Sequence, residues 1–155
     1  MGSRNTSLKF EITPGALLPL TAIYAIAVVR FGARPGVIGA TLFVLSLLAH
    51  EAGHVALAWI MDARVKAIGF CAKGAYIRRE DTHDFSEVLI AAAGPAVNLL
   101  LAAFLWNGQG VLSWLMQLNL ILGLANLIPI KGTDGRRILQ TLFPSFKPAA
   151  GASSL

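Results

Sequence analysis

The sequence has 155 residues, of which 55% are hydrophobic and only 14% are charged, and its net charge is +5. A soluble domain carries about 25% charged residues, so this composition excludes an ordinary soluble protein and indicates an integral membrane protein. The single cysteine excludes an internal disulfide. We expect one membrane-embedded domain over residues 1–155, because the chain is too short for a second compact unit.

Four apolar runs follow one another along the chain, at about 14–29, 36–61, 85–106 and 111–130. A bilayer core about 30 Å thick asks for about 20 helical residues, so each run is a candidate transmembrane helix. Between the second and third runs, residues 63–80 interleave apolar and basic side chains, which favours a short β-hairpin with a turn at Lys73-Gly74. The predicted fold class is an all-α polytopic membrane protein with about four transmembrane helices and a small β-hairpin-like loop.

The positive charges lie mostly on one side of these four spans. Of the 13 Lys and Arg residues, Arg30 and Arg34 fall between the first and second runs, and all others lie in the two termini or in the hairpin-like loop. The positive-inside rule therefore predicts a multi-pass protein of the cell (inner) membrane with both termini and that loop in the cytoplasm. Since topology explains the basic residues, we expect no nucleic-acid partner.

The second run contains the sequence His50-Glu51-Ala52-Gly53-His54. On a helix, His50 and His54 lie one turn apart on the same face, where both can reach one Zn²⁺ at about 2.0–2.1 Å. Glu51 lies about 100° further round the helix and could take a proton from an attacking water molecule. Because ionisable side chains are costly in a bilayer, this cluster indicates a functional site better than a chance pattern.

A catalytic zinc site needs a third protein ligand, and Asp134 is a candidate just past the fourth run. Pro129 cannot continue the helical hydrogen-bond pattern, so we expect the helix to break there and Asp134 to fold back towards the histidines. The alternative is an ordinary helix end followed by an exposed Asp-Gly turn. The residues after Asp134 predict a short interfacial helix that begins near it.

Two amides, Asn98 and Asn126, lie inside apolar runs, where each needs a hydrogen-bond partner. They could bind the substrate backbone or stabilise an oxyanion. They could equally form hydrogen bonds between helices.

Three motifs in this order resemble those of the site-2 protease family of intramembrane zinc metalloproteases. They are His50-Glu51-x-x-His54, Gly94-Pro95-Ala96-Val97-Asn98 and Asn126-x-x-Pro129-x-x-x-x-Asp134-Gly135. The resemblance covers about residues 40–140. It departs from the family pattern at residues 131–133, where many members have a proline-rich stretch.

The resemblance implies that His50, His54 and Asp134 bind one Zn²⁺ and that Glu51 is the catalytic acid/base. It implies a three-span catalytic core at about 36–135, in a minimal form without PDZ or CBS domains. It also implies transmembrane protein substrates within the lipid bilayer, commonly cut first by another protease.

The sequence therefore predicts a zinc-dependent intramembrane endopeptidase that cleaves transmembrane segments in regulated intramembrane proteolysis. One alternative is a zinc-binding membrane scaffold without proteolysis, against which the presence of Glu51 argues. Another is a metal or proton transporter, against which the absence of internal repeats argues.

Overall fold

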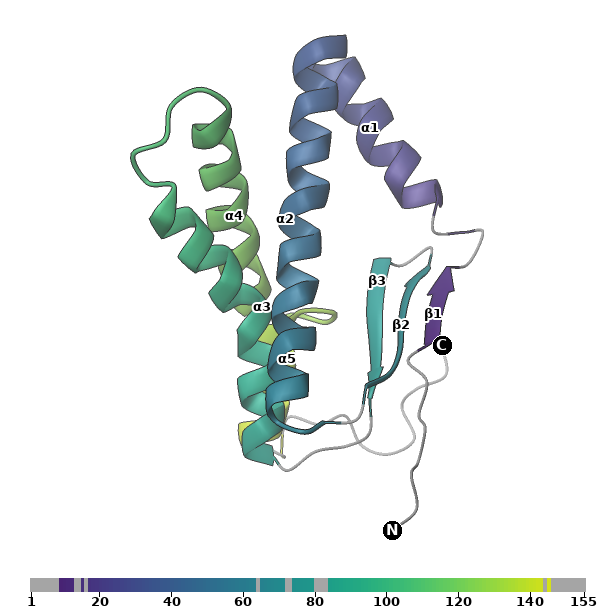
Figure 1. The fold of residues 1–155 in the computed structure, drawn as a ribbon, viewed down its shortest axis with the longest axis vertical. Coiled ribbons are helices and arrows are strands. Elements are labelled where there is room, and N and C mark those ends of the chain that lie inside the picture. Colours follow the sequence, from purple (N-terminus) through teal and green to yellow (C-terminus); the bar gives the residue numbers. More distant parts are fainter. Residues whose placement is uncertain are drawn as a thin grey trace.

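A computed structural model of the protein describes residues 9–12, 15, 17–63, 65–71, 74–79, 84–143 and 145. Five helices and three strands follow one another in the order β1 (Lys9–Ile12), α1 (Leu17–Phe31), α2 (Ala33–Ile60), β2 (Val65–Cys71), β3 (Gly74–Arg79), α3 (Asp84–Phe104), α4 (Val111–Leu127) and α5 (Asp134–Leu142). The predominantly helical fold class is confirmed, with a small sheet beside the helices (Figure 1).

Each of the four predicted apolar runs forms one helix. Within the described residues, α2 and the stretch Phe85–Phe104 of α3 are long and apolar enough to cross a membrane. The apolar helices α1 and α4 have 15 and 17 residues, which corresponds to about 22 and 26 Å. The structure thus provides two candidate spans by length, and the count of four spans stays a prediction.

Helix α2 stands at the centre of the molecule (Figure 1). It packs against α1 on one side and against α3 and α4 on the other. Helix α5 packs against α3 and, less extensively, against α4. The helices α2, α3, α4 and α5 therefore meet in one region, and this region holds the polar side chains described below.

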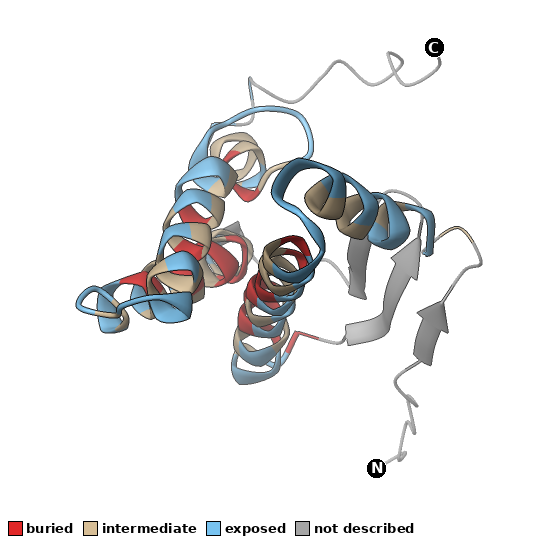
Figure 2. Cartoon of the chain, turned by 90° about the horizontal axis from the view of Figure 1, so that it is seen from above, coloured by how far each residue is buried: buried red, intermediate tan, exposed pale blue. Residues whose placement is uncertain are grey.

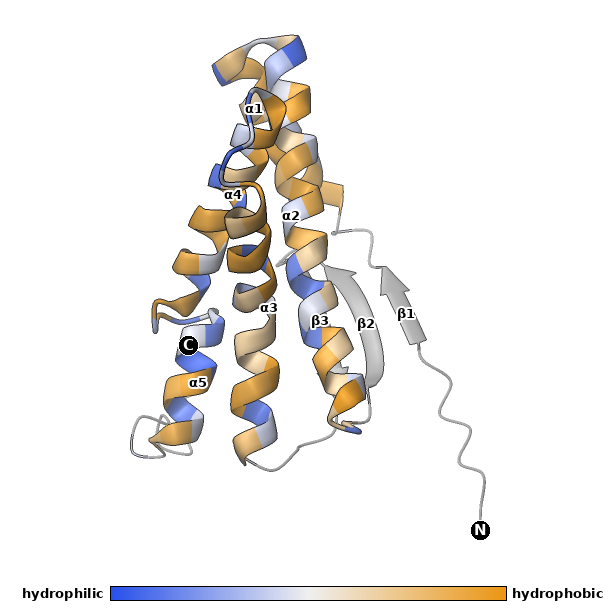
Figure 3. Ribbon diagram, turned by 60° about the vertical axis from the view of Figure 1, so that its left-hand side comes forward, coloured by the Kyte–Doolittle hydropathy of each residue, from blue (hydrophilic) through white to orange (hydrophobic). Residues whose placement is uncertain are grey.

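The distribution of side chains in the helices is inverted relative to that of a soluble protein (Figures 2 and 3). The helix contacts bury small residues such as Ala40, Ala58 and Ala102, whereas Val29 and Phe104 are 83% and 86% exposed. Small residues at helix contacts and large apolar residues on the outside are expected where lipid surrounds the protein. The largest fully buried side chains include Asn98, Asn119 and Ser46, so the interior is polar where three helices meet.

The three strands form one sheet in the order β1-β2-β3. Strands β2 and β3 are antiparallel, with Ile68 opposite Ile77 and Cys71 opposite Gly74. The predicted hairpin itself stays a prediction, because residues 72–73, which include part of the predicted turn, lie outside the described residues. Strand β1 pairs in parallel with β2, an addition that the sequence analysis did not predict.

The predicted break at Pro129 is confirmed. Helix α4 ends at Leu127, and Ile128 has the extended conformation that a following proline imposes on the preceding residue. The chain then turns through Gly132, which has a φ of +97°, and enters α5 at Asp134. The predicted short helix after the break is thereby also confirmed, with Asp134 as its first residue.

Candidate metal centre

The two histidines of α2 face the interior of the helix bundle. His50 and His54 are both buried, as their spacing of four residues on one helical face allows. Their rings meet edge to face, and their Nε2 atoms lie 3.1 Å apart. Both ring nitrogens therefore point at one place between α2, α3 and α5.

Asp134 completes a cluster of three possible ligands. Its Oδ2 atom lies 3.0 Å from Nε2 of His50 and 3.3 Å from Nε2 of His54. A tetrahedral zinc ion with ligands at about 2.0–2.1 Å separates neighbouring ligand atoms by about 3.3–3.4 Å. The cluster therefore has nearly the spacing of a tetrahedral zinc site, and these three residues can hold a metal ion.

The hydrogen-bond partner of Nδ1 in each imidazole shows which ring nitrogen carries the proton. The other nitrogen, Nε2, then faces the cluster with a lone pair. Nδ1 of His54 lies 2.7 Å from the carbonyl oxygen of Ile90, which can only accept, so this nitrogen donates. Nδ1 of His50 lies 2.6 Å from Oδ1 of Asn98 and donates likewise. In the neutral rings both Nε2 lone pairs then point at the Asp134 carboxylate, an arrangement of three acceptors that a cation satisfies.

Gly94 of α3 leaves open the space that such a cation needs. A Cβ atom at Gly94 would collide with Nε2 of His54 and would lie 2.8 Å from Nε2 of His50. Any larger residue at this position would fill the space between the two imidazoles. The donor set and this open space together fit a Zn²⁺ ion.

Local capping holds Asp134 at the start of α5. The hydroxyl of Thr133 is directed at the carbonyl oxygens of Ile128 and Ile130, at 2.6 and 2.8 Å, and accepts a bond from the Arg136 amide at 3.4 Å. A side chain at Gly135 would overlap the backbone of Leu127, so glycine allows α5 to lie against the end of α4. The alternative of an exposed Asp-Gly turn is wrong, because Asp134 is only 6% exposed.

The charge state of Asp134 follows from its surroundings. Burial opposes its ionisation, but hydrogen bonds and positive charge from the protonated forms of His50 and His54 outweigh this effect and lower the pKa of the carboxyl below its ordinary value. A cation held among the three residues would take the place of these protons and favour the carboxylate in the same way.

Glu51 follows His50 on α2 and is half-buried. The three clustered ligand atoms belong to His50, His54 and Asp134, so Glu51 is not part of that cluster.

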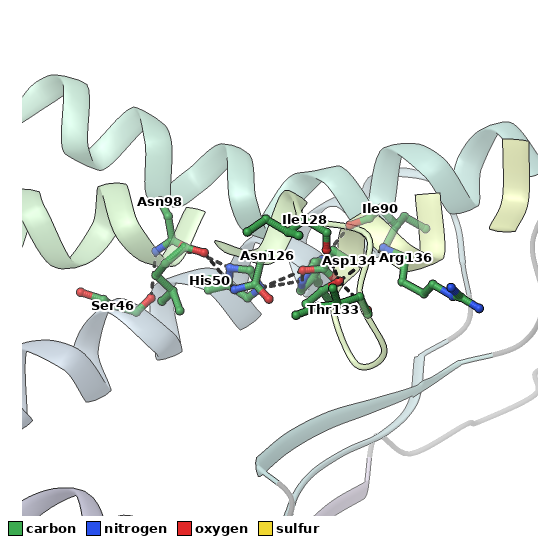
Figure 4. A network of polar contacts seen from close by, with 12 residues as sticks. Ser46, His50, Ile90, Asn98, Asn126, Ile128, Thr133, Asp134 and Arg136 are labelled. Carbon is green, nitrogen blue, oxygen red and sulfur yellow. Dashed lines mark hydrogen bonds and ion pairs between the residues drawn. The ribbon is translucent and has the colours of Figure 1, made fainter. Parts of the chain in front are cut away.

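The two predicted amides have different environments (Figure 4). Asn98 is fully buried and directs its amide at His50, Ser46 and Asn119, which favours hydrogen bonding between helices, one of the two alternatives left open for it. Asn126 is half-buried and donates one bond, to the carbonyl oxygen of Leu122 at 3.0 Å. The polar groups of the Asn98 side chain are all hydrogen-bonded, whereas Asn126 has this one side-chain bond among the described residues.

Two buried polar residues of this region were not predicted from the sequence. Asn119 of α4 and Ser46 of α2 are 0% and 1% exposed. The available signal was the same one that singled out Asn98, an amide inside an apolar run, and it applies equally to Asn119 in the sequence 118–122. Serine in a helix commonly bonds its own backbone, so Ser46 gives no comparable signal.

Comparison with known proteins agrees with the site. No family model matches the chain. A "putative zinc metalloprotease" of Synechocystis sp. is 31% identical over 157 residues, covering 87% of this chain and 41% of the relative. A "zinc metalloprotease" of Methanocaldococcus jannaschii is 32% identical over 116 residues, covering 66% of this chain and 34% of the relative.

A solved structure shares the fold as well. The site-2 protease from Methanocaldococcus jannaschii superposes with a TM-score of 0.70 and 26% identity, over 89% of this chain and 68% of that chain. The chain belongs to the site-2 protease family of zinc metalloproteases. It spans less than half the length of the two relatives matched by sequence.

Proposed function

We propose that the protein is a zinc-dependent endopeptidase that cleaves membrane-embedded substrates. The observation that carries this proposal is the convergence of His50, His54 and Asp134 on one point, next to helices α2 and α3, which expose large apolar side chains. The family relationship supports it, since the matched relatives are named as zinc metalloproteases. We assign the three converging residues as zinc ligands.

In this proposal Glu51 acts as general base and then as general acid. It accepts a proton from the attacking water molecule and delivers it to the leaving amine of the cleaved peptide bond. Zinc, when bound, supplies a Lewis acid that polarises the carbonyl group and lowers the pKa of water. His50, His54 and Asp134 hold that ion, and the surrounding helices limit the access of bulk water.

Asn126 is the candidate for substrate contact. The second amide hydrogen and the carbonyl oxygen of its side chain have no partner among the described residues. We propose that these groups bind the substrate backbone or the developing oxyanion. Preorganised donors of this kind contribute about 2.7–4 kcal/mol to transition-state stabilisation.

The proposed substrates are transmembrane segments of other proteins, commonly shortened first by another protease. A helical segment must unwind before its peptide bonds can be attacked. Strand β3 is an outer strand of the sheet, because β1 and β3 flank β2. The outer edge of β3, which pairs with no other strand among the described residues, could hold an unwound segment by strand addition, through backbone hydrogen bonds.

The decisive experiment compares the intact protein with its Glu51→Gln variant in detergent. The wild type should hold about one zinc per chain and cleave a transmembrane substrate, and chelation should abolish cleavage. The variant cannot accept a proton, so it should keep its zinc and lose about 10²–10⁴-fold in turnover.

Other outcomes contradict the proposal. Zinc binding by the wild type without cleavage would identify a scaffold, and metal uptake into vesicles would identify a transporter. Undiminished cleavage by Glu51→Gln would eliminate Glu51 as the acid/base.

A further inference from the structure

A second polar cluster lies directly behind His50, on the side away from the metal position. It consists of Ser46 on α2, Asn98 on α3 and Asn119 on α4, all almost completely buried. Water does not reach these groups, so each amide hydrogen and oxygen must find its partner within the protein. We refer to these three residues as the amide relay; Figure 4 labels Ser46 and Asn98 next to His50.

The two histidines are held by different kinds of acceptor. His54 donates to a backbone carbonyl, which has no hydrogen to offer and keeps its orientation. His50 faces the side-chain amide of Asn98, which can present either its oxygen or its NH₂ group after a half-turn. The proton on Nδ1 of His50 therefore depends on what fixes this amide.

The orientation of the Asn98 amide is fixed by a chain of hydrogen bonds. This chain begins at a backbone carbonyl oxygen, a group that can only accept. Nδ2 of Asn119 lies 2.8 Å from the carbonyl oxygen of Leu115, which can only accept. Its second hydrogen goes to the hydroxyl of Ser46 at 3.0 Å, and that hydroxyl donates in turn to Leu42 at 2.9 Å. Oδ1 of Asn119 is thereby directed at Asn98.

The order of donors and acceptors set at Asn119 determines in turn which atom of Asn98 faces His50. Nδ2 of Asn98 donates to Oδ1 of Asn119 at 2.7 Å and to the backbone oxygen of Ser46 at 3.1 Å. Both hydrogens of Asn98 are then used, and only its oxygen remains for the imidazole. Nδ1 of His50 must carry the proton, and its Nε2 lone pair is free to bind a metal.

We propose that Asn119 and Ser46 are positioning residues that, through Asn98, fix His50 in the tautomer that binds zinc. This inference rests on the proposed function for the role of His50 as a ligand. Asp134 acts in the opposite direction in the zinc-free protein, because its carboxylate 3.0 Å from Nε2 favours a proton on that nitrogen. Without the relay, this proton would occupy the coordination position.

The experiment reads the tautomer directly by ¹⁵N NMR of histidine-labelled protein. The chain has three histidines, so few signals have to be assigned. Zinc-free protein is measured at pH about 9, above the ordinary histidine pKa of about 6.5. In the wild type, His50 should be protonated at Nδ1. In Asn119→Leu, which keeps the size but removes the amide, a substantial population should move to the Nε2-protonated form.

Zinc affinity gives a second and graded readout. Asn98→Leu should weaken binding by about 10–100-fold, and Asn119→Leu by about tenfold, at the lower end of that range because it acts through Asn98. Ser46→Ala should have a smaller effect, since Asn119 keeps its bond to Leu115. The matched control is Gln117→Leu on the same helix, an exposed amide bonded to Ser113, which should change neither readout.

The proposal is overturned if Asn119→Leu leaves both the His50 tautomer and the zinc affinity unchanged. Should this variant fold poorly, Asn119→Ser, which cannot reach Asn98, is measured in the same way and decides the question. Because the tautomer is read without zinc or substrate, it tests the relay even if the wild type cleaves nothing. Failure of the wild type to bind zinc would instead contradict the proposed function.

Discussion

Gly94 has only a hydrogen atom where other residues have a side chain, and this leaves space for a metal ion beside His50 and His54. We expect Gly94→Ala to abolish zinc binding, because the added methyl group would lie against both Nε2 atoms of the ligand histidines. Alanine favours a helix over glycine by about 1 kcal/mol, so α3 itself should not be weakened. Metal content and far-ultraviolet circular dichroism measure the two effects separately.

Gly39→Ala is the control for this change. Gly39 lies on α2, and a Cβ atom there would meet nothing within 4 Å. This variant should keep its full zinc content. If Gly94→Ala also kept its zinc, the space beside the imidazoles would not be the metal position.

The third ligand is tested by Asp134→Asn. The amide has nearly the same shape as the carboxylate but is neutral, so zinc affinity should fall by more than the about 10–100-fold that loss of an outer partner costs. The control Asp62→Asn removes an exposed carboxylate, and asparagine tolerates its φ of 54°. Equal zinc affinity in Asp134→Asn and wild type would mean that the third ligand lies elsewhere.

Sequence reasoning reached the ligand residues because each carries a signal that does not depend on the fold. The spacing of His50 and His54 places them on one helical face wherever the helix lies. The distances of Asp134 and of the amide relay depend on how α3, α4 and α5 pack against α2, which no local pattern contains. The apolar run around Asn119 marks it as an amide that needs a partner, but its partners on α2 and α3 are known only from the packing of the three helices.

At the scale of the elements, the segment between α4 and α5 leads to Asp134, and it departs from the family pattern at residues 131–133, where many members have a proline-rich stretch. The Thr133 hydroxyl links the backbone of Ile128 and Ile130 to the first turn of α5. Proline restricts such a segment through its ring, whereas here a capping side chain does so through hydrogen bonds. We infer that Thr133 holds Asp134 in register with the histidines.

Thr133→Val tests this inference, because valine keeps the shape of threonine and lacks the hydroxyl. Loss of the cap costs about 1 kcal/mol, which corresponds to about fivefold in zinc affinity if the cost falls on the position of Asp134. Thr133→Ser should retain most of the affinity. Thr141→Val, which removes an exposed hydroxyl from the same helix, should leave isothermal titration with zinc unchanged.

The bounds of the helices were predictable because polar or helix-breaking residues interrupt each apolar run. Helix α4 ends at Leu127, two residues before Pro129, because proline has no amide hydrogen with which to continue the helix. Strand β1 was not predictable in the same way, because its four residues form a strand only through pairing with β2, more than fifty residues further along the chain. Long-range pairing of this kind leaves little trace in a short local pattern.

For the whole molecule, the arrangement of the helices places the connections at two opposite ends. The turn between α1 and α2, with Arg30 and Arg34 close to it, lies at the same end as the turn at 107–110 (Figure 1). The start of α3 and the end of α5 lie towards the other end (Figure 1). This separation is compatible with the predicted excess of Lys and Arg on the cytoplasmic side.

Cysteine labelling in intact cells tests this orientation. In a Cys71→Ser background, single cysteines are placed at Gln109 and at Lys131, which is exposed between α4 and α5. A reagent that cannot cross membranes should label Gln109→Cys from outside and Lys131→Cys only after permeabilisation. The two positions flank α4, so opposite labelling patterns require that α4 crosses the bilayer despite its 17 residues. Equal labelling at both positions would show that α4 does not cross. A reversed pattern would place α5 and the metal site nearer the outer face, and water and substrate would then reach Glu51 from outside the cell.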